Sequence, residues 1–374
     1  MKHYFPIAFA ALLTACAAPT LKIEVSNLSE TDREDETVEV AWSEVAALKG
    51  ATPENIVVFD DENVEIPSQV LYLGEDEPQA LIFQCDVEEQ ATRIYTIKTG
   101  QRSAYTPKAY GRFVPERLDD YAWENDKVAF RAYGPALETA PGEMLATPGF
   151  DTWVKCVDTL VVDARYLRGN YHHNYGDGMD CYKVGRTLGA GASAPYVNDT
   201  LWMSRNFATW ETLDNGPIRT TVRFTYAPFA VGNRQVSLTK VISLDAGSHF
   251  NRIENTYEGD FTTLPVAAGF VRHDVKGLTA TEEWLGFYEA ASDSKQPEID
   301  GDLYFGVILP GADFLADAAG HALAVTEVEN GVPSVYYAGS GWSQGGVEDM
   351  PDWMETLEQA TASVAAPLIV TIVE

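Results

Sequence analysis

Alternation of apolar and polar residues is the feature that most constrains the fold of this 374-residue chain. Successive side chains of a β-strand point to opposite faces, so the pattern is typical of strands with one buried face. It recurs at Leu21–Val25, Val38–Val40, Arg93–Ile97, Thr220–Tyr226 and Val236–Val241. Shorter apolar runs predict more deeply covered strands at Val57–Phe59, Val307–Leu309 and Leu368–Val373. The sequence therefore predicts an all-β fold.

Helical signal is scarce and is concentrated near the C-terminal end. Apolar residues recur there at helical spacing, at Trp353, Leu357, Ala360 and Val364. Pro351 suits the first turn of a helix, and Pro367 ends the pattern. We therefore expect a helix between these two prolines.

A polar, apolar-poor stretch at residues 100–107 predicts a domain boundary. Residues 16–105 contain several short strands separated by acidic turns, which predicts a small N-terminal β-sandwich. Residues 106–374 contain too many strands for one small sandwich, which favours a large multi-sheet β-sandwich. We assign the catalytic role to this second domain.

The N-terminus has the features of a bacterial lipoprotein signal. The apolar run Tyr4–Leu13 leads into Leu13-Thr14-Ala15-Cys16, which places small residues directly before a cysteine. This run is too short to span a bilayer as a mature helix, so residues 1–15 are predicted to be a cleaved signal peptide and Cys16 to be lipidated. We expect an exported lipoprotein, periplasmic or anchored to the outer membrane, with membrane contact through the lipid alone. The alternative is a plain secretory signal with a chance cysteine.

The net charge and its distribution along the chain restrict the kinds of ligand that this protein is expected to bind. The formal charge of −30 argues against a general nucleic-acid role, because the overall field repels phosphates. Residues 165–276 nevertheless contain twelve Lys or Arg against ten Asp or Glu, and four of the six histidines: His172, His173, His249 and His273. An anionic ligand would be attracted to this stretch. The alternative is that the basic residues pair with neighbouring acids.

Within that stretch, Arg165–Arg186 concentrates imidazole, phenol and cationic groups with little apolar alternation. This composition predicts a loop carried by a rigid sheet, where binding and catalytic groups are often found. Three interpretations are open. His172, Asp177 and Asp180 could bind a metal, although their spacing matches no zinc or calcium loop. The loop could be purely structural, or it could form an acid/base site for an acidic sugar.

A second cluster, Arg112–Asp126, precedes the strand around Arg131. Aromatic rings beside charged groups suit pyranose recognition, with the sugar stacking on Trp123 or Tyr121. The alternatives are that Arg131 forms a surface pair with Asp126 and that Trp123 belongs to the core.

At these clusters the sequence resembles a domain family of polysaccharide-utilisation systems that includes ulvan-oligosaccharide dehydratases. The resemblance lies in Arg112–Tyr133, Tyr171-His172, Gly176–Arg186, Gly189-Ala190-Gly191 and Leu213–Thr220. Weaker similarity covers nearly all of the mature chain. The resemblance implies a lyase-like or galactose-mutarotase-like β-sandwich that acts on uronic acid-containing oligosaccharides. We expect no cofactor and no catalytic metal.

Such a dehydratase would remove water across C4 and C5 of a terminal glucuronate. The enzyme must neutralise the carboxylate, supply a base near C5 and protonate the departing 4-hydroxyl. We hypothesise that Arg186 or Arg131 binds the carboxylate and that His172 and Tyr182 form the base and acid pair. Lys183 could lower the pKa of the Tyr182 phenol if the two converge, although neighbouring residues of a strand point to opposite faces.

The residues expected to bind or orient substrate complete the predicted site. They are Arg131, Trp123, Tyr171, Asp177, Asp180 and His273. Other functions remain open at this point: a surface glycan-binding lipoprotein without catalysis, a polysaccharide lyase, or an unsaturated glucuronyl hydrolase.

Overall fold

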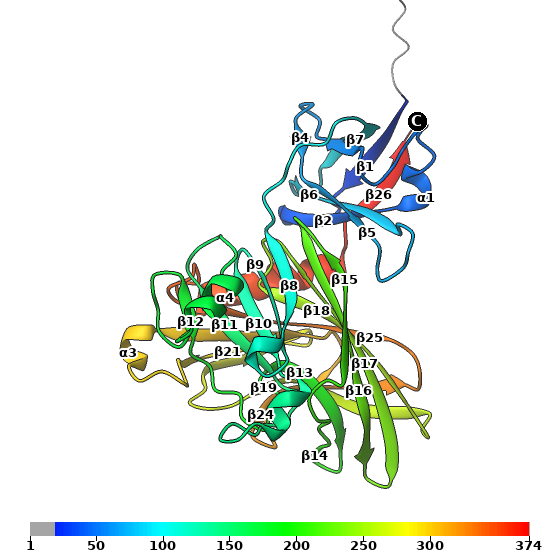
Figure 1. Ribbon diagram of the computed structural model, residues 1–374. Coiled ribbons are helices and arrows are strands. Elements are labelled where there is room, and N and C mark those ends of the chain that lie inside the picture. Colours follow the sequence, from blue (N-terminus) through cyan, green and yellow to red (C-terminus); the bar gives the residue numbers. More distant parts are fainter. Residues whose placement is uncertain (1–18, 374) are drawn as a thin grey trace, which may run out of the picture.

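The computed structural model describes residues 19–373, so the predicted signal peptide and Cys16 lie outside the described residues. The described chain is dominated by strands arranged in a small unit and a large unit, which lie end to end (Figure 1). The predicted all-β class, with a small sandwich and a large multi-sheet sandwich, is confirmed. Between residues 19 and 373, no helix has the length and apolarity to cross a membrane.

The small unit is a sandwich of two antiparallel sheets, ordered β26-β1-β7-β3-β4 and β2-β6-β5. The alternation in β1 places Ile23 and Val25 in the core between the sheets, where they join Phe83 and Ile97. Its strands are β1 (Thr20–Ser26), β2 (Arg33–Ala41), β3 (Ile56–Phe59), β4 (Glu65–Ile66), β5 (Ser68–Leu71), β6 (Ala80–Val87), β7 (Thr92–Thr99) and β26 (Ile369–Val373), with the short helix α1 (Trp42–Val45) after β2.

The C-terminal strand belongs to the small unit, which corrects the predicted assignment of residues 106–374 to one large domain. Strand β26 pairs antiparallel with β1, with Ile372 opposite Ile23. Ile369, Val370 and Ile372 are exposed, so this apolar run is also not the deeply covered strand that we expected. Hydrophobicity alone does not distinguish an edge strand from a covered one.

Three sheets form the large unit. They are ordered β12-β11-β10-β9-β8, β14-β13-β19-β24-β23 and β15-β16-β17-β18-β25-β22-β21-β20. The strands of the two five-stranded sheets are β8 (Ala109–Val114), β9 (Asp120–Asn125), β10 (Val128–Ala132), β11 (Phe150–Lys155), β12 (Gly178–Asp180), β13 (Ala190–Val197), β14 (Thr200–Leu201), β19 (Thr263–Val271), β23 (Asp313–Ala318) and β24 (His321–Glu329).

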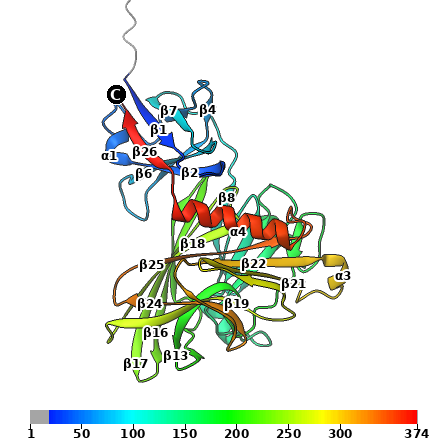
Figure 2. The same ribbon diagram turned by 180° about the vertical axis from the view of Figure 1, so that it is seen from behind.

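The eight-stranded sheet spans the large unit (Figures 1 and 2). Its strands are β15 (Thr209–Asn215), β16 (Arg219–Val231), β17 (Arg234–Asp245), β18 (Phe250–Gly259), β20 (Lys276–Ala280), β21 (Trp284–Ala290), β22 (Asp302–Ile308) and β25 (Ser334–Trp342). The helical segments are α2 (Val162–Arg168), α3 (Pro297–Asp300), α4 (Met350–Ala365) and the 3₁₀ turns η1 (Pro115–Arg117) and η2 (Pro135–Thr139).

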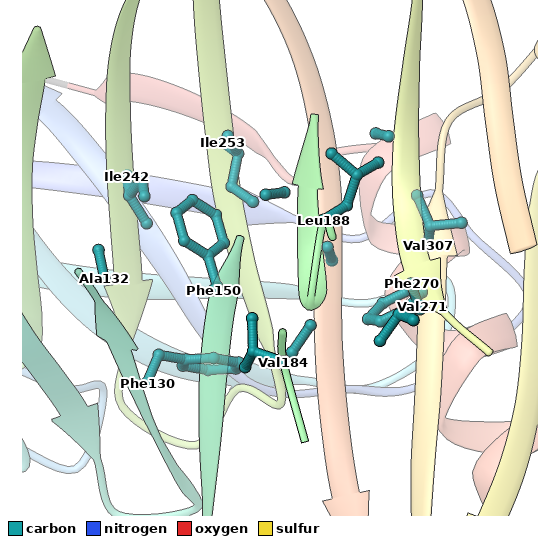
Figure 3. Packing of buried hydrophobic residues seen from close by; sticks show 14 of the residues in the cluster. Phe130, Ala132, Phe150, Val184, Leu188, Ile242, Ile253, Phe270, Val271 and Val307 are labelled. Carbon is teal, nitrogen blue, oxygen red and sulfur yellow. The ribbon is translucent and has the colours of Figure 1, made fainter. Parts of the chain in front are cut away.

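One continuous apolar core joins all three sheets of the large unit. Figure 3 shows Phe130 and Phe150, from β10 and β11, on the same side of the core as Ile242 and Ile253 of the eight-stranded sheet. Phe270 of β19 and Val307 of β22 meet in the same cluster. This packing fixes where the ends of β10, β11, β12, β19 and β21 lie relative to one another.

The predicted C-terminal helix is confirmed as α4, which crosses the outer face of the eight-stranded sheet (Figure 2). Asp349 caps its N-terminus by accepting a hydrogen bond from the backbone N–H of Asp352. Trp353 and Leu357 are fully buried against β21 and β22, as the helical spacing predicts.

Candidate active site

A buried cluster of charges lies on the outer face of the β8–β12 sheet, around Arg131. Its guanidinium group donates hydrogen bonds to two carboxyl groups. One belongs to Asp151, which lies opposite Arg131 on β11, and the other to Asp180 of β12, at 3.1 Å. Asp120 of β9 lies 3.5 Å away, and all four side chains are at most 5% exposed. One guanidinium group is therefore shared by three carboxyl groups.

This sharing determines the protonation state of the cluster. Burial raises the pKa of Asp120 to about 7, although Arg131 and Arg117 oppose the change. Burial also raises the pKa of Asp151 and that of Asp180, against the lowering effect of Arg131. Three ionised carboxylates beside one cation would leave uncompensated buried charge, so the cluster retains protons near neutral pH. Arg131 is therefore not free to bind a substrate carboxylate. This corrects the prediction for Arg131, one of the two arginines considered for that role.

Helix α2 and the loop after it cover this charged face. Glu124 of β9 accepts hydrogen bonds from the backbone N–H groups of Val161 (2.9 Å) and Val162 (2.8 Å), and so holds the start of α2. Arg165 reaches back to the carbonyl oxygen of Val154, at 2.8 Å. A Cβ atom at Gly178, whose φ is +96°, would overlap the same oxygen, so glycine is required there. The predicted loop therefore begins as a helix and is held tightly to the sheet.

Tyr171 and His172 belong to the loop that follows α2 and covers the charged face. The Tyr171 ring stacks on Trp153 at 4.9 Å, and its hydroxyl accepts a hydrogen bond from Arg117 at 2.8 Å. The Nδ1–H of His172 donates to the backbone oxygen of Asp180, at 3.0 Å. Because a carbonyl oxygen only accepts, Nδ1 carries the proton and Nε2 is left unprotonated in the neutral ring. The His172 side chain is 48% exposed.

Tyr182 does not have the free hydroxyl that its predicted acid/base role requires. Its ring lies in the core, and its hydroxyl donates to the backbone oxygen of Gly189, at 3.0 Å. Burial raises the pKa of this phenol well above its usual value, and the nearby charges of Glu289 and Asp151 add to the effect. Lys183 is exposed whereas the Tyr182 ring is buried, and the pKa of Tyr182 is raised rather than lowered.

His273 follows β19 and forms a close pair with a carboxylate that the sequence prediction did not include. Its Nδ1 is 2.6 Å from Oε1 of Glu289, and its backbone N–H donates to Oε2 at 3.2 Å. Glu289, on β21, is fully buried, whereas the His273 side chain is 24% exposed. The imidazole also lies edge-on to the Tyr182 ring, with 5.5 Å between centroids.

The segment after β21 brings His172 and His273 into one region. The backbone N–H of Asp293 donates to the carbonyl of Cys181, at 2.9 Å. A carboxylate oxygen of Asp293 lies 3.8 Å from Nδ1 of His172. The chain therefore runs from Glu289, beside His273, to Asp293, beside His172. Figure 1 shows β12 and the end of β21 on the same side of the large unit.

Most basic side chains of residues 165–276 pair with acids, as the alternative interpretation of the charge pattern expects. Arg168, for example, pairs with Asp177 at 2.9 Å, which gives Asp177 a structural partner. Among the described residues of this stretch, the exposed cations without an ion-pair partner are Lys183, Arg186 and Arg234. Two of these, Lys183 and Arg186, lie within four residues of Tyr182 in the sequence.

Trp123 and Tyr121 are core residues, which corrects the expectation that a sugar ring stacks on them. Both are at most 1% exposed. Trp123 packs between Phe130 and Phe150 and donates its indole N–H to Asn251, at 2.7 Å. The strand alternation of β9 places both rings on the core face of the sheet. The alternative, that Trp123 belongs to the core, is confirmed.

The predicted acid/base and carboxylate-binding residues differ in exposure. His172 is half exposed, Tyr182 is internal, and Arg186 is on the surface. A groove of about 1000 Å³ exists elsewhere, between the small unit and α4, and none of the predicted site residues lines it. No cluster of three or more His, Cys, Asp or Glu residues suited to a metal occurs in residues 19–373. The accessible imidazoles of the candidate site are those of His172 and His273, each anchored through Nδ1.

Four acidic or phenolic residues of this region were absent from the prediction: Asp120, Tyr133, Asp151 and Glu289. Tyr133 is buried beside the Arg131 cluster, 5.2 Å from its guanidinium group. Asp120, Asp151 and Glu289 are carboxylates within otherwise largely apolar strands. Charged residues are rarely buried unless they are paired, so an acid inside such a strand is the signal that could have identified them.

Comparisons with known proteins were consistent with this architecture. A family described as "Domain of unknown function (DUF4861)" matches residues 25–370. "Uncharacterized protein P7" of Formosa agariphila is 30% identical over 409 residues, covering all of both chains. A crystal structure of a glycosyl hydrolase family 38 protein from Enterococcus faecalis is similar in fold, with a TM-score of 0.54 and 10% identity over 95% of this chain. This chain spans about half of that protein, 47% of its length.

Proposed function

The chain belongs to the DUF4861 family, and we propose that it is a carbohydrate-active enzyme that removes water across C4 and C5 of a terminal glucuronate in ulvan-type oligosaccharides. The motifs Tyr171-His172 and Gly176–Arg186 support this proposal through their resemblance to oligosaccharide dehydratases. The fold similarity to a glycosyl hydrolase family 38 protein supports a carbohydrate substrate.

The observation that carries the proposal is the state of His172. Its Nδ1–H is fixed on the Asp180 carbonyl, so Nε2 faces away from that contact as a proton acceptor. The ring is half exposed and is held on one side by Tyr171, with 4.9 Å between centroids. An oriented base at an accessible surface is what proton abstraction from a sugar carbon requires.

Arg186 and Lys183 supply the second requirement, a positive charge for the uronate. The C5 proton becomes more acidic when the neighbouring carboxylate is neutralised. Arg186 has no ion-pair partner in the described chain, and its planar guanidinium suits two-pronged carboxylate binding. Arg131 cannot take this role, because Asp151 and Asp180 already occupy it. We therefore assign the carboxylate to Arg186, with Lys183 in support.

The experiment that tests the proposal follows ultraviolet absorbance during incubation with glucuronate-ended oligosaccharides. Elimination creates a double bond conjugated with the carboxylate, so we expect absorbance to rise while chain length, measured by chromatography, stays constant. A rise together with chain shortening would indicate a polysaccharide lyase. A loss of absorbance from unsaturated oligomers would indicate an unsaturated glucuronyl hydrolase. Binding without any change in absorbance would indicate a non-catalytic glycan-binding protein.

The exported lipoprotein state also remains a proposal. The order Leu13-Thr14-Ala15-Cys16 supports it, and labelling with a radioactive fatty acid would test it. Loss of the label in Cys16→Ser is the expected result.

A further inference from the structure

The pair formed by His273 and Glu289 is chemically different from the other buried charges of the molecule. Asp120, Asp151 and Asp180 share Arg131, and Glu124 pairs with Lys155 at 3.0 Å. Within residues 19–373, the ion-pair contact of Glu289 is to His273 alone. A fully buried carboxylate is costly without a compensating cation, and a histidine provides one only when it is protonated.

Glu289 contacts His273 through both of its carboxyl oxygens. Oε2 accepts a hydrogen bond from the backbone N–H of His273, and Oε1 lies 2.6 Å from Nδ1. An ionised carboxylate only accepts, so Nδ1 is the donor to Glu289 in its carboxylate form. The carboxylate fixes the ring and stabilises the imidazolium that forms when Nε2 is also protonated. His273 is thus prepared to hold, and to release, a proton at Nε2.

His172 and His273 contact the same short segment of chain. His172 is anchored on the carbonyl of Asp180, and His273 packs against the ring of Tyr182, two residues later. Asp293 bonds this segment at Cys181 and lies beside His172, four residues after Glu289, the partner of His273. An elimination needs its acid and its base at one sugar ring, and these shared contacts are the ground for assigning both roles to the two imidazoles.

We propose that His273, held by Glu289, is the general acid that protonates the departing 4-hydroxyl group, while His172 is the base. This inference rests on the proposed dehydratase function. The two anchors differ in strength of charge contact: His172 is hydrogen-bonded to a backbone carbonyl, with carboxylate oxygens of Asp180 and Asp293 only at 3.7 and 3.8 Å, whereas a buried carboxylate oxygen lies 2.6 Å from His273. Tyr182, the predicted acid or base, instead packs against the His273 ring.

Nε2 of His172 takes the C5 proton, and the C5–H electron pair forms the C4–C5 double bond. The C4–O bond breaks, and its oxygen takes the proton from Nε2 of His273 and leaves as water. His172 then releases its proton to solvent, and His273 takes one up. No oxidant or other co-reactant is needed.

The test compares two substrates that differ in the leaving group. One is a glucuronate-ended oligosaccharide, and the other carries fluorine in place of the 4-hydroxyl. Fluoride leaves without being protonated, so its elimination does not need the acid. We expect His273→Gln to slow water elimination by roughly 10²–10⁴-fold and to leave fluoride release near the wild-type rate. His172→Ala should slow both reactions, and the exposed neighbour His173→Gln, the matched control, should slow neither.

Glu289→Gln provides a second variant that keeps the hydrogen-bonding shape but removes the charge. It should slow water elimination more than fluoride release, and circular dichroism checks its folding. Equal losses on both substrates in His273→Gln, or no loss on either, would overturn the general-acid role while the dehydratase function stands. A wild-type protein that eliminates neither water nor fluoride would overturn the dehydratase function itself, and this inference with it.

Discussion

At the residue scale, removal of the Tyr182 hydroxyl distinguishes a structural role of this residue from a catalytic one. It donates to the Gly189 carbonyl inside the core. We predict that Tyr182→Phe lowers the free energy of unfolding by about 1–2 kcal/mol, because one buried hydrogen bond is lost. Turnover should stay near the wild-type value. A fall in turnover of about 10²-fold or more, measured on folded protein, would restore Tyr182 as an acid or base.

Asp120 gives a prediction about pH. Its pKa of about 7 in the folded protein lies above its ordinary value of 3.8, because it is buried. The folded state therefore binds this proton more tightly, so the free energy of unfolding falls as pH rises from about 4 to about 7. Asp120→Asn removes this titration, and its stability should fall less over that range, by on the order of 3 kcal/mol. Denaturant unfolding at both ends of the range measures the difference. Equal pH dependence in the two proteins would contradict the raised pKa.

Part of the candidate site could be predicted from the sequence. The segment containing His172, Asp180 and Arg186 stands out because its polar groups break the strand pattern. Its partners Asp151 and Glu289 do not stand out, since each is a single acid in a strand whose register cannot be derived from local sequence. Whether Arg131 is free or already paired depends on that register. Side-chain roles were therefore less predictable than the region itself.

At the scale of elements, Arg33 of β2 links the small unit to α4. It is 3% exposed, and its guanidinium group donates to the carbonyl oxygens of Ala362 (3.0 Å) and Ala366 (3.2 Å), at the C-terminal end of the helix. Positive charge is favourable at this end of a helix. We predict that Arg33→Lys lowers the free energy of unfolding by about 2–3 kcal/mol, because a second guanidinium nitrogen also donates to Ser363 Oγ and one ammonium nitrogen cannot occupy both donor positions.

The matched control is Arg93→Lys in the same unit. Arg93 is one-third exposed and pairs with Asp61 and Glu88 at the surface, so its replacement should change stability by less than about 1 kcal/mol. Urea denaturation of both variants gives the comparison. Similar losses in the two would show that the link to α4 contributes no more than a surface ion pair.

Element types were well predicted where the pattern was strong. The alternating segments within β1, β2, β7, β16 and β17 are strands, and the spacing around Trp353 is a helix. The partner of each strand was less accessible, because pairing is set by contacts between distant parts of the chain. Val370 shows this limit: the strand was predicted, but not its place at an exposed edge beside β1.

At the scale of the whole molecule, the first and last strands of the described chain, β1 and β26, pair in one sheet, so the small unit depends on the C-terminal strand. We predict that deleting residues 369–374 exposes the edge of β1, lowers stability and increases proteolysis in residues 100–107, which lack helix and strand. Pairing by β26 is through its backbone, and Ile372 is exposed. Ile372→Thr should therefore change stability by no more than about 0.5 kcal/mol. A deletion variant as stable as the full chain would show that β26 is dispensable.

The most direct test of the account is the mass of a glucuronate-ended oligosaccharide after incubation with wild-type protein, His172→Ala and His173→Ala. If Nε2 of His172 removes the C5 proton, the wild type and His173→Ala should give a product lighter by one water, and His172→Ala should form it roughly 10²–10⁴-fold more slowly. A substrate of unchanged mass with the wild type, or equal rates with His172→Ala and the wild type, would contradict it.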